Sequence, residues 1–435
     1  MTSDTTNTPP ALTGRLFADD AFDFTARHAI GKASQGVFDL GVATGTLARI
    51  ADGDPESWLR EWTATADRLR RQAVAGDQAG RHRSAARLYL GAAEAYARAV
   101  AFVDGLPDDR ALLPAFRRHR VCWESFVEVS RGAHVRFDIA YQNTTLPGYL
   151  FRPDDSGAVR PTVVITNGSD GSLSGLWGEG IKAGLERGWN VFVFDGPGQQ
   201  SVLFEQGIPF RHDWEKVLTP VVDALLTRSD VDGGKLLALG ISQGGYWLPR
   251  ALAFEHRFVA AVVDDGVWDV ARVWYANLPR PLLDLLRAGE RDRFNQAMAA
   301  APVDPVRRRA FRFRARPYGA FDTPYDLFRA VGDYRLEDVA GRVRTPMLIC
   351  DPDDEAWFAG QPRELYDALR CEKELAHFSR EDGAGLHCEP WARDLVAART
   401  CDFFQRHLEV AETVSPVRAI RDCPPHGDDS QRPNP

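Results

Sequence analysis

The sequence predicts an α/β protein built on a mostly parallel β-sheet with helices on both faces. Short apolar runs alternate with helical stretches from residue 161 onward, which is typical of buried parallel strands joined by crossover helices. One of these runs leads directly into a Gly-x-Ser-x-Gly turn that is followed by a helix. The chain has 435 residues, of which 44% are hydrophobic and 26% charged, so it carries enough apolar material for a large core.

Residues 1–120 are expected to form an N-terminal helical domain. Asp54, Pro55 and Glu56 are typical of a helix start, because they supply a cap, a proline at the first helical position and an acid in the first turn. Apolar residues then recur at steps of three and four, first along residues 58–73 and again along residues 88–99. No second copy of this pair follows at a fixed period. A helical hairpin packed on a larger domain is therefore favoured over a TPR-like scaffold.

Residues 121–270 are expected to form the first part of the sheet domain. Residues 126–129 and 134–141 alternate as half-buried antiparallel strands do, and a third strand at 149–151 can follow a Pro-Gly turn. Apolar runs then predict buried parallel strands, with a crossover helix near residues 214–225. These runs are residues 162–166, 191–194, 236–239 and 259–263.

The rest of the chain divides into three parts. Strand signals stop at residues 271–340, where Arg, Ala and aromatic residues dominate, and a helical lid insertion is expected. The second part of the sheet domain follows at residues 341–410, with strands near 347–350 and 375–378. Residues 411–435 lack periodicity and are expected to be a disordered tail.

The strongest chemical signal is the sequence Gly240-Ile241-Ser242-Gln243-Gly244 between a predicted strand and a predicted helix. A serine on such a tight turn projects its hydroxyl outward, and its neighbours must be glycine to avoid a clash. We therefore expect Ser242 to be a nucleophile. The backbone N–H of Gln243 is then expected to be one donor of an oxyanion hole.

A second oxyanion donor is expected from the loop after an earlier strand. The sequence Asn-Gly-Ser-Asp-Gly at residues 167–171 directly follows the run at 162–166, and its glycines would let the backbone approach a substrate. The amide of Ser169 or of Asp170 is the candidate. The alternative is an ordinary Gly-rich turn in which Asp170 caps the next helix.

The general base should be a histidine after the last strand, because the chain order in this arrangement is Ser, acid, His. His387 lies on a Gly-rich loop beyond the strand predicted at 375–378. It is preferred over His377, which lies inside that strand, and over His407 in the last helix.

The acid should follow the strand near residues 347–350, where four acidic residues cluster between 351 and 355. Counting forward from Pro346 and backward from Trp357 places Glu355 at the acid position, with Asp354 beside it. Both remain candidates. Calcium binding by this cluster is disfavoured, because the EF-hand spacing and its glycine are missing.

Together these stretches resemble the α/β-hydrolases that carry an N-terminal helical domain. This group includes fungal pigment-pathway polyketide-shortening hydrolases and the bacterial 2,6-dihydroxypseudooxynicotine hydrolase. The resemblance covers roughly residues 55–405. It rests on residues 167–171, 195–199 and 213–215, on the Ser242 turn with Pro249 and Arg250, and on residues 360–362 and 383–388.

The resemblance implies an α/β-hydrolase fold and a Ser-acid-His triad, with no cofactor and no metal. It implies cleavage of a C–C bond next to a carbonyl, or of an ester or amide, in a bulky aromatic or polyketide-like small molecule. A plain carboxylesterase or amidase, a non-hydrolytic acyltransferase or cyclase on the same triad, and an inactive scaffold are the alternatives. Two features depart from the family pattern: Glu355 stands where relatives have Asp, and Asp264 and Asp265 follow a predicted strand.

Composition and charge exclude other classes of function. A net charge of −8 does not favour binding to nucleic acid or to a membrane surface. No apolar run reaches the roughly 18 residues of a membrane span, and residues 1–10 do not resemble a secretory signal. The six cysteines show no CxxC spacing, so we expect free thiols and a cytoplasmic protein. A homodimer is expected, and only because homodimers are the commonest assemblies among soluble oligomeric proteins.

Overall fold

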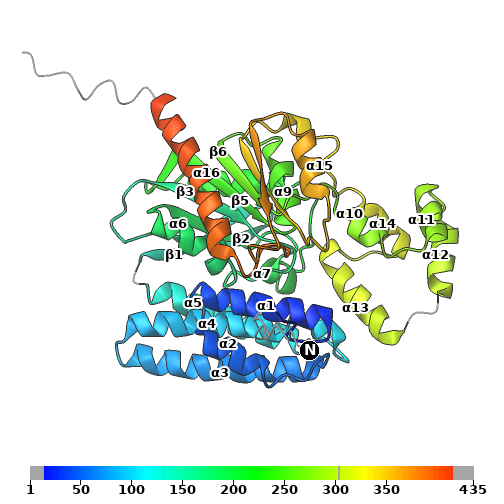
Figure 1. Cartoon of the computed structure of the whole chain (residues 1–435), viewed down its shortest axis with the longest axis horizontal. Coiled ribbons are helices and arrows are strands. Elements are labelled where there is room, and N and C mark those ends of the chain that lie inside the picture. Colours follow the sequence, from blue (N-terminus) through cyan, green and yellow to red (C-terminus); the bar gives the residue numbers. More distant parts are fainter. Residues whose placement is uncertain (1–13, 131, 302–303, 415–435) are drawn as a thin grey trace, which may run out of the picture.

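Helices at the start of the chain form a layer beside the sheet domain (Figure 1). The structure is a computed structural model that describes residues 14–130, 132–301 and 304–414. As predicted, the Asp54 carboxylate caps one helix by accepting the N–H groups of Glu56 and Ser57, with Pro55 at the first helical position. The layer contains α1 (Asp20–Ser34), α2 (Leu40–Leu47), α3 (Pro55–Gln78), α4 (His82–Ala99), η1 (Val103–Gly105) and α5 (Leu112–Glu128).

The end of α5 corrects one prediction. Residues 126–129, expected to be a strand, instead form the last turn of this helix and its C-cap, Val129, and the domain boundary expected at residue 120 falls inside the helix. Four alternating residues are too few to distinguish a strand from the buried stripe of a helix. The buried residues at the end of this stripe are Cys122, Trp123, Phe126 and Val127.

The described residues form an eight-stranded sheet in the order β1-β2-β4-β3-β5-β6-β7-β8. β2 pairs antiparallel with β1 and β4, and all other neighbours are parallel. Parallel strands end at the same edge of a sheet, so the loops after β3, β5, β6, β7 and β8 meet there. The strands are β1 (His134–Tyr141), β2 (Thr144–Phe151), β3 (Arg160–Thr166), β4 (Asn190–Phe194), β5 (Val231–Ile241), β6 (Phe258–Asp264), β7 (Met347–Pro352) and β8 (Lys373–Phe378).

The turn predicted at Pro147 and Gly148 lies within β2 and does not separate two strands. The chain reverses at Gln142, whose φ is 48°, and Pro147 pairs with Asp138 inside the hairpin. A Cβ on Gly148 would lie 2.4 Å from Cζ of Phe192 on the neighbouring strand. The glycine is therefore required by the close approach of an aromatic ring and not by a turn.

Helices cover both faces of the sheet. α8 (Glu215–Leu225), α9 (Gly244–Leu252) and α15 (Gln361–Ala368) pack on one face, while α16 (Arg393–Val414) and the N-terminal helices pack on the other. Side chains alternate between the two cores along a strand, so Val163 and Ile165 face one core and Val164 the other. Three shorter helices lie in the connections between strands. They are η2 (Trp177–Ile181) and α6 (Lys182–Glu186) between β3 and β4, and α7 (Gln200–Phe204) between β4 and α8.

Between β6 and β7 the chain leaves the sheet and forms a helical arm at one side of the molecule (Figure 1). Many of its aromatic side chains pack on one another, including Trp274 and Phe311 against Phe328. The arm contains α10 (Ala271–Tyr275), α11 (Arg280–Arg287), α12 (Arg291–Ala300), α13 (Pro305–Ala315), η3 (Arg316–Tyr318) and α14 (Pro324–Val331), and η4 (Ala340–Arg342) leads back to the sheet.

The end of the chain also differs from the expectation. α16 continues to Val414, so residues 411–414 are helical where a tail was predicted. The rest of that predicted tail, residues 415–435, lies outside the described residues, as do residues 1–13. Within the part of the chain that the structure describes, no helix has both the length and the apolar character needed to cross a membrane.

Candidate active site

The predicted nucleophile lies on a sharp turn between β5 and α9. Ser242 has a φ of 53°, a conformation that serine rarely adopts, and its N–H donates to the carbonyl of Asp264 at 2.6 Å. Glycines allow the turn to close: a Cβ on Gly244 would lie 2.4 Å from the carbonyl oxygen of Thr166, and one on Gly240 would lie 2.5 Å from that of Gly244. Ser242 therefore sits, half-buried, at the edge where the parallel strands end.

Three of the predicted residues meet at this edge. The Ser242 hydroxyl donates a hydrogen bond to Nε2 of His387 at 2.9 Å, and Nδ1 of His387 donates to Oε2 of Glu355 at 2.6 Å. Glu355 follows β7 and His387 follows β8, so the sheet brings together residues that are far apart in the sequence. His387 is 7% exposed and Glu355 8%, which keeps this chain of hydrogen bonds largely out of water.

The structure separates the two candidate acids. The carboxylate of Asp354 forms an ion pair with Arg380, whose Nε lies 2.9 Å from Oδ2, and it makes no contact with His387. The carboxylate of Glu355 points the other way, to the imidazole. Of the two acids that the sequence left open, only Glu355 lies where it can orient His387.

The surroundings of Glu355 favour its charged form. Its Oε1 accepts the backbone N–H groups of Trp357 and Phe358 at 2.8 and 2.9 Å. Burial by itself would raise the pKa of this carboxyl, but hydrogen bonds and the charge of His387 hold the pKa well below its ordinary value. Burial likewise lowers the pKa of His387, yet the negative groups facing it prevail and raise that pKa well above its ordinary value.

A further carboxyl, which the sequence analysis did not assign to the site, faces the same nitrogen of His387. Oδ2 of Asp265 lies 2.7 Å from Nδ1, and the Asp265 side chain is completely buried. The signal available in the sequence was its position. Asp265 follows β6, which lies between the strands that carry Ser242 and Glu355, so a side chain at its end can reach the site.

Other buried ionisable groups lie next to Asp265. Nη1 of Arg393 donates to Oδ2 of Asp264 at 2.7 Å, and the fully buried Glu389 carboxylate makes no hydrogen bond with the described residues. Ligand atoms of Asp264, Asp265 and Glu389 lie within 4.8 Å of one another, so a cation could be held there. Burial and the neighbouring Asp264 raise the pKa of Glu389 well above its ordinary value, however. The raised pKa of Glu389 and the guanidinium of Arg393 both reduce the negative charge of this cluster.

The predicted oxyanion loop lies against the nucleophile. A Cβ on Gly168 would lie 3.0 Å from the Cβ and 3.5 Å from the Oγ of Ser242. The backbone N–H groups of Gln243, Ser169 and Asp170 donate to no group among the described residues, so they are free to bind an oxyanion. The Asp170 carboxylate is turned to solvent, 3.6 Å from Arg314, so only its amide is a candidate donor.

Both the N-terminal helices and the helical arm reach this edge of the sheet. From α1, the ring of Phe24 packs 4.8 Å from Trp357, which in turn packs edge-on 4.9 Å from the imidazole of His387. From the arm, the hydroxyl of Tyr318 donates to Oε1 of Gln243 at 3.4 Å. Segments outside the sheet domain thus contact residues on either side of Ser242.

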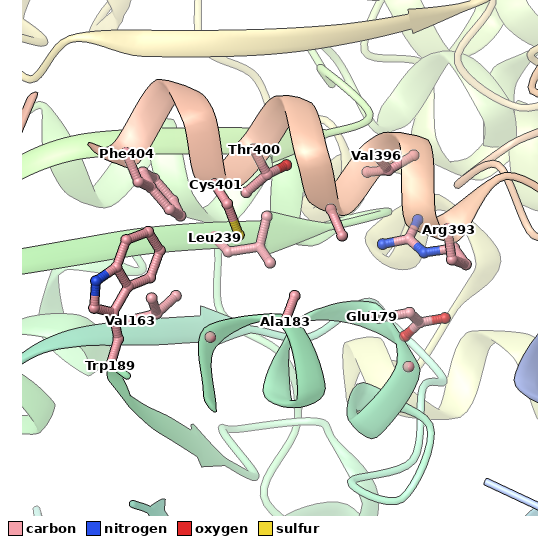
Figure 2. Close-up of a pocket in the computed structure, with 14 residues that line it drawn as sticks. Val163, Glu179, Ala183, Trp189, Leu239, Arg393, Val396, Thr400, Cys401 and Phe404 are labelled. Atoms are coloured by element: carbon pink, nitrogen blue, oxygen red, sulfur yellow. The ribbon is translucent and has the colours of Figure 1, made fainter. Parts of the chain in front are cut away.

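Two hollows in the structure lie elsewhere. Figure 2 shows an apolar one between α6 and α16, with Trp189 near one end and Arg393 and Glu179 at the other. Its volume of about 20 Å³ holds roughly one water molecule. A groove of about 1060 Å³ lies between the N-terminal helices and the sheet domain. Neither Ser242 nor His387 lines either hollow, so neither is the reaction site.

Comparison with known proteins finds similar hydrolases. No model of a known protein family matches the chain. The chain is 31% identical over 418 residues to the alpha/beta hydrolase xenA of Xenoacremonium sinensis, covering 89% of this chain and 97% of the relative. It is 28% identical over 403 residues to the 20-hydroxy-prefusarin hydrolase FUS2 of Gibberella moniliformis, covering 88% and 95%. The crystal structure of a 2,6-dihydroxy-pseudo-oxynicotine hydrolase superposes with a TM-score of 0.66 at 18% identity, covering 86% and 95%.

Proposed function

Because this chain belongs to the α/β hydrolases, we propose that it is a serine hydrolase in which Ser242, His387 and Glu355 form the catalytic triad. The observation that carries the proposal is the unbroken chain of hydrogen bonds from Oγ of Ser242 through both nitrogens of His387 to Glu355. This arrangement activates a serine hydroxyl, because the imidazole can take its proton while the acid holds the ring in the required tautomer.

The proposed reaction begins when Oγ of Ser242 attacks the carbonyl carbon of the substrate and its proton passes to Nε2 of His387. Glu355 stabilises the imidazolium that forms. The amides of Gln243 and of Ser169 or Asp170 bind the oxyanion, and each such donor is commonly worth about 3 kcal/mol. His387 then returns the proton to the leaving group, and a water molecule hydrolyses the acyl-enzyme by the same steps in reverse order.

The proposed substrate is a bulky aromatic or polyketide-like small molecule with a carbonyl next to the bond that breaks. The names of the relatives support this class, since they describe hydrolases of 20-hydroxy-prefusarin and of 2,6-dihydroxy-pseudo-oxynicotine. For a C–C bond, the leaving group departs as an enolate or carbanion that His387 protonates. Such a departure needs an acidic leaving group, so 1,3-diketones and acylated phenols are the substrates to test first.

The experiment is labelling of the full-length protein with a fluorophosphonate, which reacts with an activated serine whatever the natural substrate is. We expect labelling of the native protein, loss of labelling in Ser242→Ala and a large loss in His387→Ala. The matched control is Ser84→Ala, which changes an exposed serine on α4 and should leave labelling unchanged. An unlabelled native protein, or undiminished labelling of Ser242→Ala, would overturn the proposal.

A second measurement distinguishes the bond that is cleaved. Rates with 1,3-diketones and with short p-nitrophenyl esters separate a C–C hydrolase from a carboxylesterase. Product analysis with an added amine or alcohol separates hydrolysis from acyl transfer, because a transferase would give the amide or ester in preference to the acid. We expect the acid product and faster turnover of the diketone.

A further inference from the structure

Two carboxyl groups approach one nitrogen of the proposed catalytic base. Nδ1 of His387 lies 2.6 Å from Oε2 of Glu355 and 2.7 Å from Oδ2 of Asp265. A triad needs one acid at this position, and Nδ1 carries one hydrogen. The close approach of a second carboxyl therefore calls for its own explanation.

The two carboxyls have different partners. Oε1 of Glu355 accepts two backbone N–H groups, from Trp357 and Phe358, and such donors stabilise a negative charge. Oδ1 of Asp265 has no hydrogen-bond donor among the described residues, and its Oδ2 receives only a long 3.4 Å contact from the N–H of Cys388 besides His387. The negative charge therefore belongs on Glu355.

The groups packed around Asp265 do not supply a compensating charge either. Besides His387 and Glu355, it is faced by Cys388, Asp264, Glu389 and Arg393. The guanidinium of Arg393 donates to Asp264 at 2.7 Å and to the carbonyl of Cys388 at 2.8 Å, so it is already engaged. Adjacent buried carboxyls cannot all be ionised, because like charges repel strongly in a medium of low dielectric constant.

We propose that Asp265 is a positioning residue of the triad: its carboxyl is protonated at neutral pH and donates a hydrogen bond to Glu355, which fixes that carboxylate and the His387 ring against Ser242. The inference rests on the proposed serine hydrolase function. Burial and a side-chain hydrogen bond between Asp265 and Glu355 raise the pKa of Asp265 well above its ordinary value, as a protonated donor at this position requires.

A neutral acid at this position has a chemical advantage over a charged one. A second negative charge 2.7 Å from Nδ1 would stabilise the imidazolium further and raise the pKa of His387 beyond the shift that Glu355 causes. A general base must lose its own proton before it can accept the serine proton. Protonated Asp265 therefore orients the acid without adding to the raised pKa of the base.

The test compares Asp265→Asn with Glu355→Gln in the full-length chain, because both variants remove a carboxyl and keep its shape. The measurement is the second-order rate constant of fluorophosphonate labelling at Ser242 as a function of pH. In Asp265→Asn the amide N–H replaces the acid O–H, so labelling should stay within about threefold of the native rate, with an unchanged acid limb. Glu355→Gln removes the charge and should lose about 100-fold or more.

Three results would overturn the inference. Asp265→Asn could lose as much activity as Glu355→Gln, or its acid limb could move down by about one pH unit or more, which would show that Asp265 is charged. Alternatively, Asp265→Leu, which offers no hydrogen bond, could react as fast as the native protein, whereas we expect at least about a tenfold loss relative to Asp265→Asn. Circular dichroism checks that each variant folds. If Asp265→Leu does not fold, the comparison of Asp265→Asn with Glu355→Gln still tests the proposal.

The proposed function fails in a different way. It fails if the native protein is not labelled, or if Ser242→Ala is labelled as well as the native protein. If the native protein is labelled and Ser242→Ala is not, then any of the three results above overturns only the role of Asp265.

Discussion

The hydroxyl of Tyr318 donates a 3.4 Å hydrogen bond to Oε1 of Gln243, which links the helical arm to the residue directly after the proposed nucleophile. Trp274 holds this hydroxyl from the other side, since its Nε1 donates to the Tyr318 oxygen at 3.3 Å. Burial raises the pKa of Tyr318 to about 12, so the hydroxyl keeps its proton and remains a donor at neutral pH. The arm therefore helps to orient the Gln243 side chain.

Replacing Tyr318 by phenylalanine should slow labelling of Ser242 by about two- to tenfold, the equivalent of one lost hydrogen bond of 0.5–1.5 kcal/mol. The ring would still pack against Phe210 and Trp274, so the fold should be kept. Tyr325→Phe is the matched control, because this tyrosine lies on the same arm and its hydrogen bond to Asn295 comes from the backbone N–H, which the substitution keeps. Equal labelling rates in both variants would contradict the prediction.

The contact between α1 and the His387 loop depends on a glycine. A Cβ on Gly31 would lie 1.9 Å from the carbonyl oxygen of Pro390, three residues beyond His387. Gly31→Ala should therefore displace the loop, lower stability by about 1–3 kcal/mol and slow labelling of Ser242. Gly41→Ala is the control: its Cβ would meet nothing within 4 Å, and alanine is the better helix former. Urea unfolding and labelling check both, and an unchanged Gly31→Ala protein would refute the contact.

An ion pair connects the helical arm to the N-terminal helices. Nε of Arg314 donates to Oδ2 of Asp104 at 2.8 Å, and Nη1 lies 3.6 Å from Asp170 in the oxyanion loop. Arg314→Gln should change the free energy of unfolding by less than about 1 kcal/mol, because both charges are partly exposed. It should nevertheless increase hydrogen exchange of the α13 amides, measured by mass spectrometry. Arg312→Gln changes an exposed neighbour and should leave the exchange of these amides unchanged. Equal exchange in both variants would show that the ion pair of Arg314 does not restrain α13.

The buried His119 should make stability fall as the pH drops below about 6.5, because this histidine stays neutral in the folded protein. Burial lowers the pKa of His119 to about 3, while its unfolded value is 6.5. Between these values the unfolded chain binds the additional proton, so the free energy of unfolding decreases as the pH falls, by about 1.4 kcal/mol per pH unit for each such group.

The variant that checks this is His119→Gln, whose amide can keep the hydrogen bond to Ser174. Its free energy of unfolding in urea should depend less steeply on pH than that of the native protein. Some pH dependence of the free energy of unfolding should remain in His119→Gln, because burial also lowers the pKa of His134 to about 4. His256→Gln, at an exposed position, is the control and should keep the native slope. A native slope in His119→Gln would contradict the prediction.

The parts of the site that the sequence could predict are those encoded by short, local patterns. The turn at Ser242 combines a buried strand, glycines that exclude a Cβ and a following helix within a few residues. The prediction of His387 rests on its position after the last strand, because the residues of such a site follow the chain order Ser, acid, His. By contrast, the predictions of a strand at residues 126–129 and of a turn at Pro147 and Gly148 are wrong. Residues 126–128 continue the buried stripe of α5, and Gly148 is needed for the close approach of Phe192.

The choice between Glu355 and Asp354 shows a second limit. The two residues are adjacent and chemically alike, and only the path of the loop after β7 turns one to His387 and the other to Arg380. Asp265 illustrates the same point. Its sequence position was visible, but its contact with His387 arises from three loops that converge at one sheet edge.

The sequence by itself determined that the protein has an α/β fold, and it predicted a nucleophile turn, a histidine base and a nearby acid, because strand periodicity and glycine-dependent turns are local properties of the chain. Only the tertiary structure decided which carboxyls meet His387 and which outside segments contact the site. Those contacts join residues from separate elements: Glu355 and His387 are 32 positions apart, Gln243 and Tyr318 are 75 apart, and Asp265 and Cys388 are 123 apart. Local propensities do not determine such distances; the packing of the sheet and its covering helices does.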